Sequence, residues 1–280
     1  MPGSLFVVAT PIGNLEDITL RALRTLKEVD VIAAEDTRRT AKLLAHYDIQ
    51  KPMISLREHN ESREAGRLVE RISRGESIAL VSDAGTPTVS DPGTHLIGLA
   101  RKAGVQVVPI PGPSAVVTAL SASGFPADQF TFLGFPPASG QERDDWFETL
   151  WETPSTIVFF EAPHRIERTL DQLRKFVERP IIICRELTKM NEELVEWNNN
   201  AAVKSLGEFV VVVGPSAKHA DAEVDDTDAA RIFGQIKEST QFEEADVLAM
   251  VASHLKISPS KARKHVKKGS ISLKREAETQ

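Results

Sequence analysis

The feature that most constrains the fold is a regular alternation of short apolar runs with amphipathic segments along the N-terminal part of the chain. Segments with helical spacing, such as 18–29 and 62–74, separate these runs. The apolar runs lie at residues 5–9, 31–34, 53–56, 78–81 and 105–109. Strands that are apolar along their whole length are typical of a parallel sheet buried on both faces. We therefore predict an α/β fold with a parallel sheet in an N-terminal domain, residues 1–112.

A proline-rich joint at 109–113 separates this pattern from a second one, because proline restricts φ and removes a backbone donor. The second pattern predicts strands at 130–135, 156–160, 180–184 and 209–213, and helices at 143–151 and 164–177. We place a second α/β domain at 113–216, although one continuous sheet is also compatible. After a polar linker, a helical tail is expected over 225–280, with helices at 229–238, 243–254 and 258–268.

The tail concentrates positive charge in a chain whose net charge is −6. Between Lys256 and Arg275 there are eight Lys or Arg and no Asp or Glu. A short helix, a turn and a basic helix resemble a helix-turn-helix module, while a solvated basic helix fits the sequence equally well. On the first interpretation the basic helix contacts the phosphates of a polyanion. The candidate phosphate contacts there are Lys261, Arg263, Lys264, Lys267 and Lys268.

The overall composition is that of an ordinary globular protein, with 41% apolar and 26% charged residues. No apolar run reaches the length that spans a bilayer, and no secretory leader precedes the first strand. The lone Cys184, inside an apolar run, indicates a buried thiol in a reducing compartment. We expect a soluble cytoplasmic protein without a membrane partner.

Polar loops follow four predicted strands of the first domain, at 10–15, 34–40, 57–61 and 82–93. Since the carboxyl ends of parallel strands share one edge, these loops are expected to converge where open α/β sheets bind ligands. The most informative loop is Ser82–Pro87, in which Asp, Ala, Gly, Thr and Pro follow an apolar strand closely. The loops contain neither of the usual glycine-rich nucleotide fingerprints, which favours a different ligand with a hydroxylated sugar.

The other loops offer charged and titratable side chains. Asp36, Arg38 and Arg39 suit recognition of a phosphate-bearing substrate, or the capping of a helix. Arg57 is a candidate phosphate contact and His59 a candidate base, although a surface helix cap accounts equally well for their loop. No Cys/His cluster has zinc spacing and no Ser-His-Asp set can be assigned, so no metal is implied.

Four motifs, in this order, resemble the ribosomal RNA small subunit methyltransferase I family. They are TPIGNL at Thr10–Leu15, AEDTR at Ala34–Arg38, SDAGTP at Ser82–Pro87 and PGPSA at Pro111–Ala115. The resemblance implies the two-domain tetrapyrrole-methylase fold, with a mixed sheet in the C-terminal domain. It also implies an S-adenosylmethionine-dependent enzyme that methylates the ribose 2′-hydroxyl of a cytidine. The implied target lies in the decoding region of small-subunit (16S) ribosomal RNA, and the implied assembly is a homodimer.

The same resemblance assigns roles to individual residues. Asp36 and His59 become candidate bases, and Arg38 or Lys189 the candidate cation that stabilises the developing alkoxide. Arg39 and Arg165 are assigned to the RNA side of the cleft, with Arg57 as a candidate RNA phosphate contact, and the basic residues of the tail become candidate RNA-binding residues. The residues assigned to the cofactor are Pro11, Gly13, Asp83, Ala84, Gly85, Thr86, Pro87, Ser114, Ala115, Phe160 and Glu161. The segment Met190–Leu206 is shorter than the family pattern and contains no glycine.

Two other functions remain compatible with the sequence. One is a C-methyltransferase of tetrapyrroles or other small molecules on the same fold, although the arginines of the second loop and the basic tail favour RNA. The other is a non-catalytic RNA-binding assembly factor that retains an old cofactor pocket. Calorimetry with S-adenosylmethionine distinguishes these possibilities, because the non-catalytic assembly factor is expected not to bind the cofactor.

Overall fold

The computed structural model describes residues 3–176, 179–197, 203–216, 225–240, 242–255, 257 and 259–278. Its internal contacts divide the chain into two compact units. The first contains residues 1–122 together with 186–193, and the second contains 123–185 together with 194–280. The helix that begins at Ala115 thus belongs mostly to the first unit, whereas the sequence places it in the second domain. The predicted three-part domain organisation stays a prediction.

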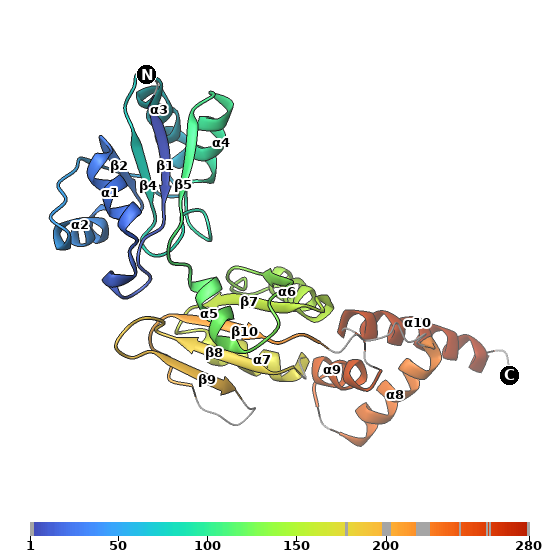
Figure 1. Cartoon of the computed structure of the whole chain (residues 1–280). Helices are drawn as coiled ribbons and strands as arrows, with labels where there is room; N and C mark the ends of the chain where they lie inside the picture. The colour runs from blue at the N-terminus through green and yellow to red at the C-terminus, as the bar shows by residue number, and fades with distance from the viewer. Residues whose placement is uncertain are drawn as a thin grey trace. The chain divides into compact units, whose positions relative to one another are not determined.

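The first unit is built on a five-stranded sheet. Its strands are β1 Ser4–Val8, β2 Val31–Ala34, β3 Met53–Ser55, β4 Ile78–Val81 and β5 Gln106–Ile110. They lie in the order β3-β2-β4-β1-β5, and every neighbouring pair is parallel (Figure 1). The predicted parallel sheet is thereby confirmed. Because β4 lies between β2 and β1, the loops that follow these three strands are neighbours at the carboxyl edge.

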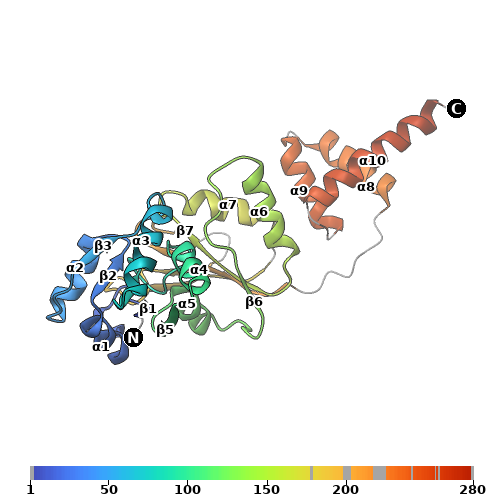
Figure 2. The same ribbon diagram turned by 90° about the horizontal axis from the view of Figure 1, so that it is seen from above.

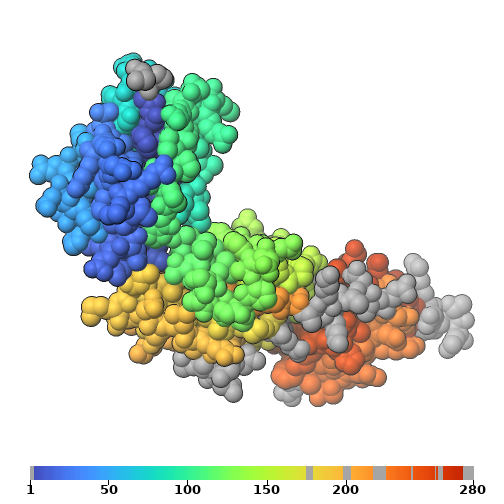
Figure 3. All heavy atoms as spheres, viewed as in Figure 1, coloured from blue at the N-terminus to red at the C-terminus, as the bar shows by residue number. Residues whose placement is uncertain are grey.

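Helices cover both faces of this sheet, as Figures 1 and 2 show. On one face lie α1 Leu20–Glu28 and α2 Thr37–His46, and on the other α3 Glu61–Ser73 and α4 Thr94–Lys102. The first unit also contains the 3₁₀ helix Leu15–Asp17 and most of α5 Ala115–Ser123. Alternate residues of a strand point to opposite faces. Val31 therefore packs with α3 and α4, whereas Ile32 packs with α1 and α2. In the space-filling view, side chains fill the space between these ribbons (Figure 3).

The second unit contains a mixed sheet, as expected. Its strands are β6 Phe130–Phe132, β7 Thr156–Glu161, β8 Ile181–Arg185, β9 Glu193–Trp197 and β10 Phe209–Val213. In the order β6-β7-β10-β8-β9, β6 runs parallel to β7, and β10 runs antiparallel to β7 and β8. Strand β9, which lies within the short segment 190–206, was not predicted from the sequence. Cys184 is buried in β8, in agreement with its prediction.

Two helices, α6 Gln141–Glu152 and α7 Ile166–Phe176, pack their apolar residues against one face of this sheet. The end that the sequence predicts for the second helix, Val177, lies outside the described residues. Arg143 of α6 is the largest of the fully buried side chains among the described residues, with an exposed fraction of 2%.

The tail forms three packed helices, α8 Asp226–Ser239, α9 Glu244–Leu255 and α10 Pro259–Glu278 (Figure 2). Helix α10 continues ten residues beyond its predicted end at 268. Gly269, which follows that predicted end, lies inside the helix, where a Cβ atom would stand 1.7 Å from the carbonyl oxygen of Asp226. Glycine here permits close packing of α10 on α8 and does not end the helix. Lys256 and Ser258 lie outside the described residues.

Within the described part of the chain, no helix is both long enough and apolar enough to cross a bilayer.

Candidate active site

Hydrogen bonds join the loops at the carboxyl edge of the first sheet. Between the loops after β3 and β2, the Arg57 Nε–H donates to the carbonyl oxygen of Glu35 at 3.2 Å. Between the loops after β2 and β4, the Asp36 N–H donates to Oδ1 of Asp83 at 2.9 Å. Asp83 in turn donates its own N–H to Oε2 of Glu35 at 3.3 Å. The acidic residues of two loops therefore hold each other in place.

The remaining loops are joined to the same assembly. Thr10, after β1, and Gly85, after β4, exchange two backbone hydrogen bonds of 2.9 Å each. The Thr86 hydroxyl donates to the carbonyl oxygen of Pro113, just before Ser114 and the start of α5, at 3.1 Å. The convergence predicted for the loops of the first domain is thus confirmed for those after β1, β2, β3 and β4, and the loop after β5 joins them.

A cluster of carboxylates lies at the centre of this edge. Burial and the negative charges of Glu35 and Asp83 raise the pKa of Asp91 to about 6, from an ordinary value of 3.8. Burial also raises the pKa of Glu35, although the Asp83 N–H opposes this shift. Neither Glu35 nor Asp91 was among the predicted site residues. Their position in strand-end loops, with Asp91 directly before Pro92, was the available signal.

The loop that carries Asp91 has an unusual backbone. Gly85, Thr88 and Ser90 have φ values of +82°, +73° and +66°. For Thr and Ser this left-handed conformation is strained and persists only where the surrounding structure enforces it. Such strain is typical of ligand-binding loops, and here it accompanies the carboxylate cluster. Pro87, between these residues, is buried, and Ala84 is exposed.

Asp36 is occupied as the N-cap of α2. Its Oδ1 accepts the Arg38 N–H at 2.9 Å and the Arg38 Nε–H at 3.1 Å, and its Oδ2 lies 2.7 Å from Nη2 of Arg38. The hydrogen bonds from Arg38 lower the pKa of Asp36 well below its ordinary value. Such a carboxylate is a weak base, so the geometry favours the capping role over the base role.

The other predicted substrate residues of the first unit differ in their surroundings. Arg39 is exposed, with Nη1 at 3.4 Å from Oδ2 of Asp83. Arg57 and His59 are exposed in the turn before α3. The Asn60 side chain in this turn accepts the Arg57 N–H at 2.7 Å and donates to the carbonyl oxygen of Ser55 at 3.1 Å. The structure therefore places Arg57 beside the loop cluster, through its bond to the β2 loop.

Lys189 lies in a segment of the first unit that packs on Gly13. A Cβ atom on Gly13 would stand 2.5 Å from Cγ of Lys189 and 2.7 Å from Oγ1 of Thr188. The Asn14 N–H donates to this same hydroxyl oxygen at 3.0 Å. The Lys189 ammonium lies 2.8 Å from Oε1 of Glu186. Glycine at 13 thus permits the close approach that brings Lys189 beside the loop after β1.

Phe160, Glu161 and Arg165 lie in the second unit, at the end of β7. The Glu161 carboxylate, with no exposed side-chain surface, accepts the Ala162 N–H at 2.8 Å and lies 2.7 Å from Nη2 of Arg165. It also accepts the Thr169 hydroxyl, which accepts Nη2–H of Arg143 at 2.7 Å. Glu161 is therefore the centre of a buried structural network. Arg165, a predicted RNA contact, has a side chain that is only 20% exposed.

Phe160 is part of an aromatic cluster next to this network. Its ring centroid lies 4.9 Å from that of Phe132 and 5.4 Å from that of Phe135, which is half exposed. Aromatic rings with an open face suit a planar ligand.

The basic residues of the tail form an exposed stripe along α10, comprising Lys261, Arg263, Lys264, Lys267 and Lys268. Lys261 lies 3.7 Å from Oε1 of Glu152, with both side chains about half exposed, so this ion pair contributes little stability. Among the described residues, no group of three or more His, Cys, Asp or Glu side chains could hold a metal ion.

The parallel sheet with its edge of joined loops, followed by a mixed sheet, defines a protein of the tetrapyrrole methylase class. A family model of tetrapyrrole (corrin/porphyrin) methylases matches residues 4–202. Among solved structures, a diphthine synthase is similar with a TM-score of 0.59 and 15% identity, covering 76% of this chain and 90% of that one. The Thermus thermophilus uroporphyrin-III C-methyl transferase complexed with S-adenyl homocysteine has a TM-score of 0.54 and 16% identity, covering 75% and 97%.

Relatives with closer sequences narrow this class. Ribosomal RNA small subunit methyltransferase I of Halalkalibacterium halodurans is 47% identical over 230 residues, covering 79% of each chain. The protein of the same description from Xylella fastidiosa is 43% identical over 271 residues, covering 93% of this chain and 97% of its own. The chain belongs to the ribosomal RNA small subunit methyltransferase I family, within the tetrapyrrole methylases.

Proposed function

We propose that the chain transfers a methyl group from S-adenosylmethionine to small-subunit ribosomal RNA. The methyl acceptor is the ribose 2′-hydroxyl of a cytidine in the decoding region. The observation that carries the proposal is the carboxylate cluster of Glu35, Asp83 and Asp91 at the edge where the loops meet. The relatives that match most of the chain carry the name of a ribosomal RNA methyltransferase, which supports the choice of substrate.

The residues at this edge fit S-adenosylmethionine. The molecule carries a positive sulfonium, a positive ammonium and a ribose with two hydroxyls, all of which carboxylates bind well. Asp91 has a raised pKa because it is buried and faces two other acids. A cationic, hydroxyl-rich ligand relieves this repulsion, whereas an anionic nucleotide phosphate adds to it. The cluster therefore selects the sulfonium cofactor over the phosphate-rich nucleotides bound by many α/β sheets.

The residues proposed to hold the cofactor are those of the joined loops. Asp83 and Asp91 supply charge and hydrogen-bond acceptors, and the exposed Ala84 leaves room beside the backbone. Pro11, Gly13, Gly85, Thr86, Pro87, Ser114 and Ala115 supply the surrounding loop walls, and Phe160 and Glu161 remain proposed for the second unit. When bound, the cofactor supplies an electrophilic methyl group on a positively charged sulfur.

The contribution of the chain itself is mainly orientation. Methyl transfer is an in-line displacement, so holding the 2′-oxygen in line with the methyl carbon provides much of the rate enhancement. The 2′-hydroxyl is a weak acid and benefits from a base. We keep His59 as the proposed base, because its ring is exposed while Asp36 is occupied by Arg38. Lys189 or Arg38 is the proposed cation for the developing alkoxide, and Arg39 and Arg57 the proposed phosphate contacts.

The test is transfer of labelled methyl from S-adenosylmethionine to three substrates: small ribosomal subunits, naked small-subunit RNA and a porphyrinoid. We expect label in RNA, at one cytidine whose 3′ phosphodiester resists alkaline hydrolysis. Label in the porphyrinoid alone overturns the RNA assignment in favour of a tetrapyrrole methylase. Label in RNA at a base, with the backbone still cleaved by alkali, overturns the 2′-oxygen assignment. Sedimentation of the purified chain tests the homodimer that belongs to the same proposal.

A further inference from the structure

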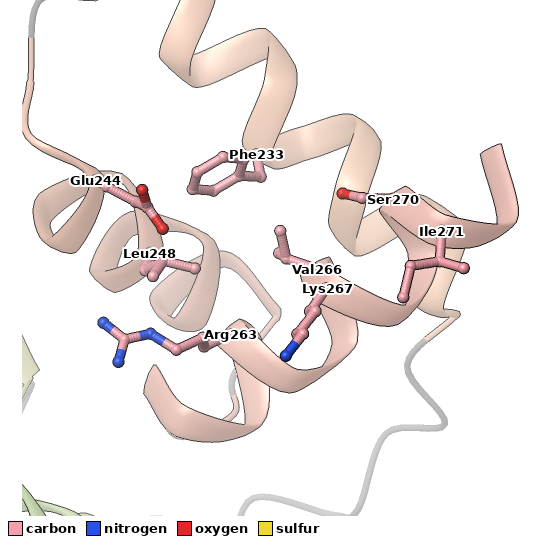
Figure 4. A pocket seen from close by; sticks show the side chains of 8 residues that line it. All are labelled: Phe233, Glu244, Leu248, Arg263, Val266, Lys267, Ser270 and Ile271. Carbon is pink, nitrogen blue, oxygen red and sulfur yellow. The ribbon is translucent and has the colours of Figure 1, made fainter. Parts of the chain in front are cut away.

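The tail contains a groove that the proposed catalytic function does not use. Helices α8, α9 and α10 surround a hollow of about 450 Å³ (Figure 4). Its floor is apolar, formed by Leu248 of α9 and Val266 of α10, whose exposed fractions are 3% and 7%. Phe233 of α8 provides an aromatic wall. The groove is therefore suited to a flat apolar group and not to an ion alone.

The rim of the groove is positively charged. Arg263 and Lys267 of α10 line it, and Figure 4 shows both on the side opposite Phe233. The Lys237 ammonium lies over the Phe233 ring, 5.5 Å from its centroid, so a third cation contacts the aromatic residue of the wall. Glu244, at the first turn of α9, is the one acidic residue of the lining. A bound polyanion is thus expected to run along the α10 side.

We infer that this groove binds an unpaired nucleobase of single-stranded RNA, an inference that rests on the proposed RNA methyltransferase function. The base lies on the apolar floor against Phe233, and the flanking phosphates pair with Arg263 and Lys267. An aromatic platform beside a cationic track is the usual means of binding single-stranded nucleic acid, because every base has a stacking face and every nucleotide a phosphate. The complementary charge of α10, which has no acidic residue between 256 and 275, selects a polyanion as the occupant.

Binding of a base in this groove differs from general attraction between RNA and a basic helix. General attraction depends on the number of charges and not on which side of α10 they lie. If the groove binds a base, substitution of Phe233, Arg263 or Lys267 should weaken RNA binding more than substitution of neighbouring residues does. Phe242 provides a matched control for Phe233, since it is an aromatic residue of the tail, 51% exposed, that does not line the groove. Lys264 is the corresponding control for Lys267.

The test measures binding of the full chain to an eight-nucleotide oligocytidine by fluorescence anisotropy. We expect Phe233→Leu, which keeps the apolar wall but loses the aromatic face, to weaken binding about tenfold. Phe233→Tyr should restore it and Phe242→Leu should leave it unchanged. Lys267→Ala should weaken binding several times more than Lys264→Ala. Circular dichroism melting of each variant establishes that α8–α10 remain folded.

A second measurement does not depend on folding of a variant. Oligonucleotides that contain 4-thiouridine, irradiated with the unaltered chain, should form a cross-link to the peptide that contains Phe233. Equal affinity for Phe233→Leu and the unaltered chain, or a cross-link confined to other peptides, overturns the inference. A third outcome also overturns the inference: Phe233→Leu binds assembled subunits more weakly but binds naked RNA normally. The groove would then bind a ribosomal protein and not RNA.

The same variants separate this inference from the proposed function. If the unaltered chain methylates no ribosomal RNA but Phe233→Leu loses oligonucleotide affinity, the catalytic proposal fails and the groove stands. If methylation occurs and the oligonucleotide affinity of Phe233→Leu is unchanged, the groove fails and the catalytic proposal stands.

Discussion

The Asp83 carboxylate accepts the backbone N–H of Asp36 at 2.9 Å, across 47 positions of sequence. This bond joins the loop after β4 to the loop after β2, and the second oxygen of Asp83 lies 3.4 Å from Arg39. Asp83 therefore fixes the geometry of a neighbouring loop, in addition to its proposed contact with the cofactor. A substitution at this residue is expected to act in both ways.

We predict that Asp83→Ala weakens S-adenosylmethionine binding at least tenfold, about 1.4 kcal/mol, because a charge-assisted partner and a loop anchor are lost together. Asp83→Asn retains an oxygen that can accept the Asp36 N–H, so it should lose less affinity. Isothermal titration calorimetry measures both. Glu70→Ala, which alters an exposed acid on α3, is the control and should bind normally. A folded Asp83→Ala variant with unchanged affinity contradicts the assignment.

Asp91 should reduce the stability of the folded chain at neutral pH. Its folded-state pKa of about 6 lies above the ordinary value of 3.8, so the folded state binds the proton more tightly than the unfolded state. The stabilisation that comes from tighter proton binding by Asp91 in the folded state is complete below about pH 4, and it is lost as the pH rises through 6. Asp91→Asn removes the ionisable group, so it should stabilise the protein at pH 8 by about 1 kcal/mol, after allowance for partial exposure.

Denaturation in urea at pH 4.5, 6 and 8 measures this effect. The gain from Asp91→Asn should shrink steadily as the pH falls. The exposed Asp17, changed to Asn, is the control and should show no such trend. A gain of equal size at all three pH values would mean that Asp91 stays ionised in the folded protein throughout this range.

The affinity for S-adenosylmethionine should depend on the same ionisation. A positive ligand lowers the pKa of Asp91, so binding favours the ionised carboxylate. Affinity is therefore expected to rise as pH increases through 6 and to level off above about 7, with a proton released on binding in the lower range. Calorimetry in buffers of different ionisation enthalpy counts this proton. Asp91→Asn should bind more weakly and show a flat profile, whereas a flat profile in the unaltered chain contradicts the prediction.

The sequence predicts the first sheet and its loop edge well for a physical reason. Each strand buries both faces, so the apolar runs are continuous, and parallel pairing then forces the loops to one edge. The relatives also place the chain in the family that its four motifs resemble. The roles of individual residues stay predictions, since motifs identify residue types and not their contacts.

Long-range contacts account for what sequence reasoning missed. Strand β9 has the polar sequence ELVEW, and only its place next to β8 makes it a strand. Arg143 resembles a surface helix residue, yet it is buried because Thr169 and Gln172 of α7 accept its N–H groups. The Glu61 carboxylate accepts three backbone N–H groups at the start of α4. One of them belongs to Gly93, which is 32 positions further along the chain. Local patterns contain no signal for such partners.

Gly13 should tolerate no side chain. A Cβ atom there would meet Lys189, Thr188 and the Leu187 carbonyl oxygen at 2.5–2.8 Å, and these belong to a segment with its own backbone strain. We predict that Gly13→Ala destabilises the protein by about 2 kcal/mol, the usual result of overpacking, and lowers kcat/KM for methyl transfer about tenfold. Urea denaturation and labelled-methyl assays measure the two effects.

Thr188 offers the matched comparison for this contact. Thr188→Val removes the oxygen that accepts the Asn14 N–H, whereas Thr188→Ser retains it. If this hydrogen bond positions the loop after β1, the Val variant should lose methyl transfer and the Ser variant should keep it. Equal activity of the two variants would show that packing against Gly13, and not the hydrogen bond, holds the loop.

Glu161→Gln should destabilise the second unit by about 3 kcal/mol, because it leaves the Arg165 and Arg143 cations in a buried site without their counter-charge. Burial already lowers the pKa of Arg143, which shows how poorly the site solvates a cation. Thr169→Val removes the hydroxyl that links Glu161 to Arg143, so it tests the same network from the other side.

Thermal melting of the two variants and calorimetry at 15 °C, where both remain folded, distinguish structure from cofactor binding. If the main role of Glu161 is structural, both variants melt earlier and neither changes the affinity for S-adenosylmethionine. A loss of affinity in Glu161→Gln but not in Thr169→Val would support a role for Glu161 in binding the cofactor. The reason is that Thr169→Val disturbs the same network but leaves the carboxylate charge in place.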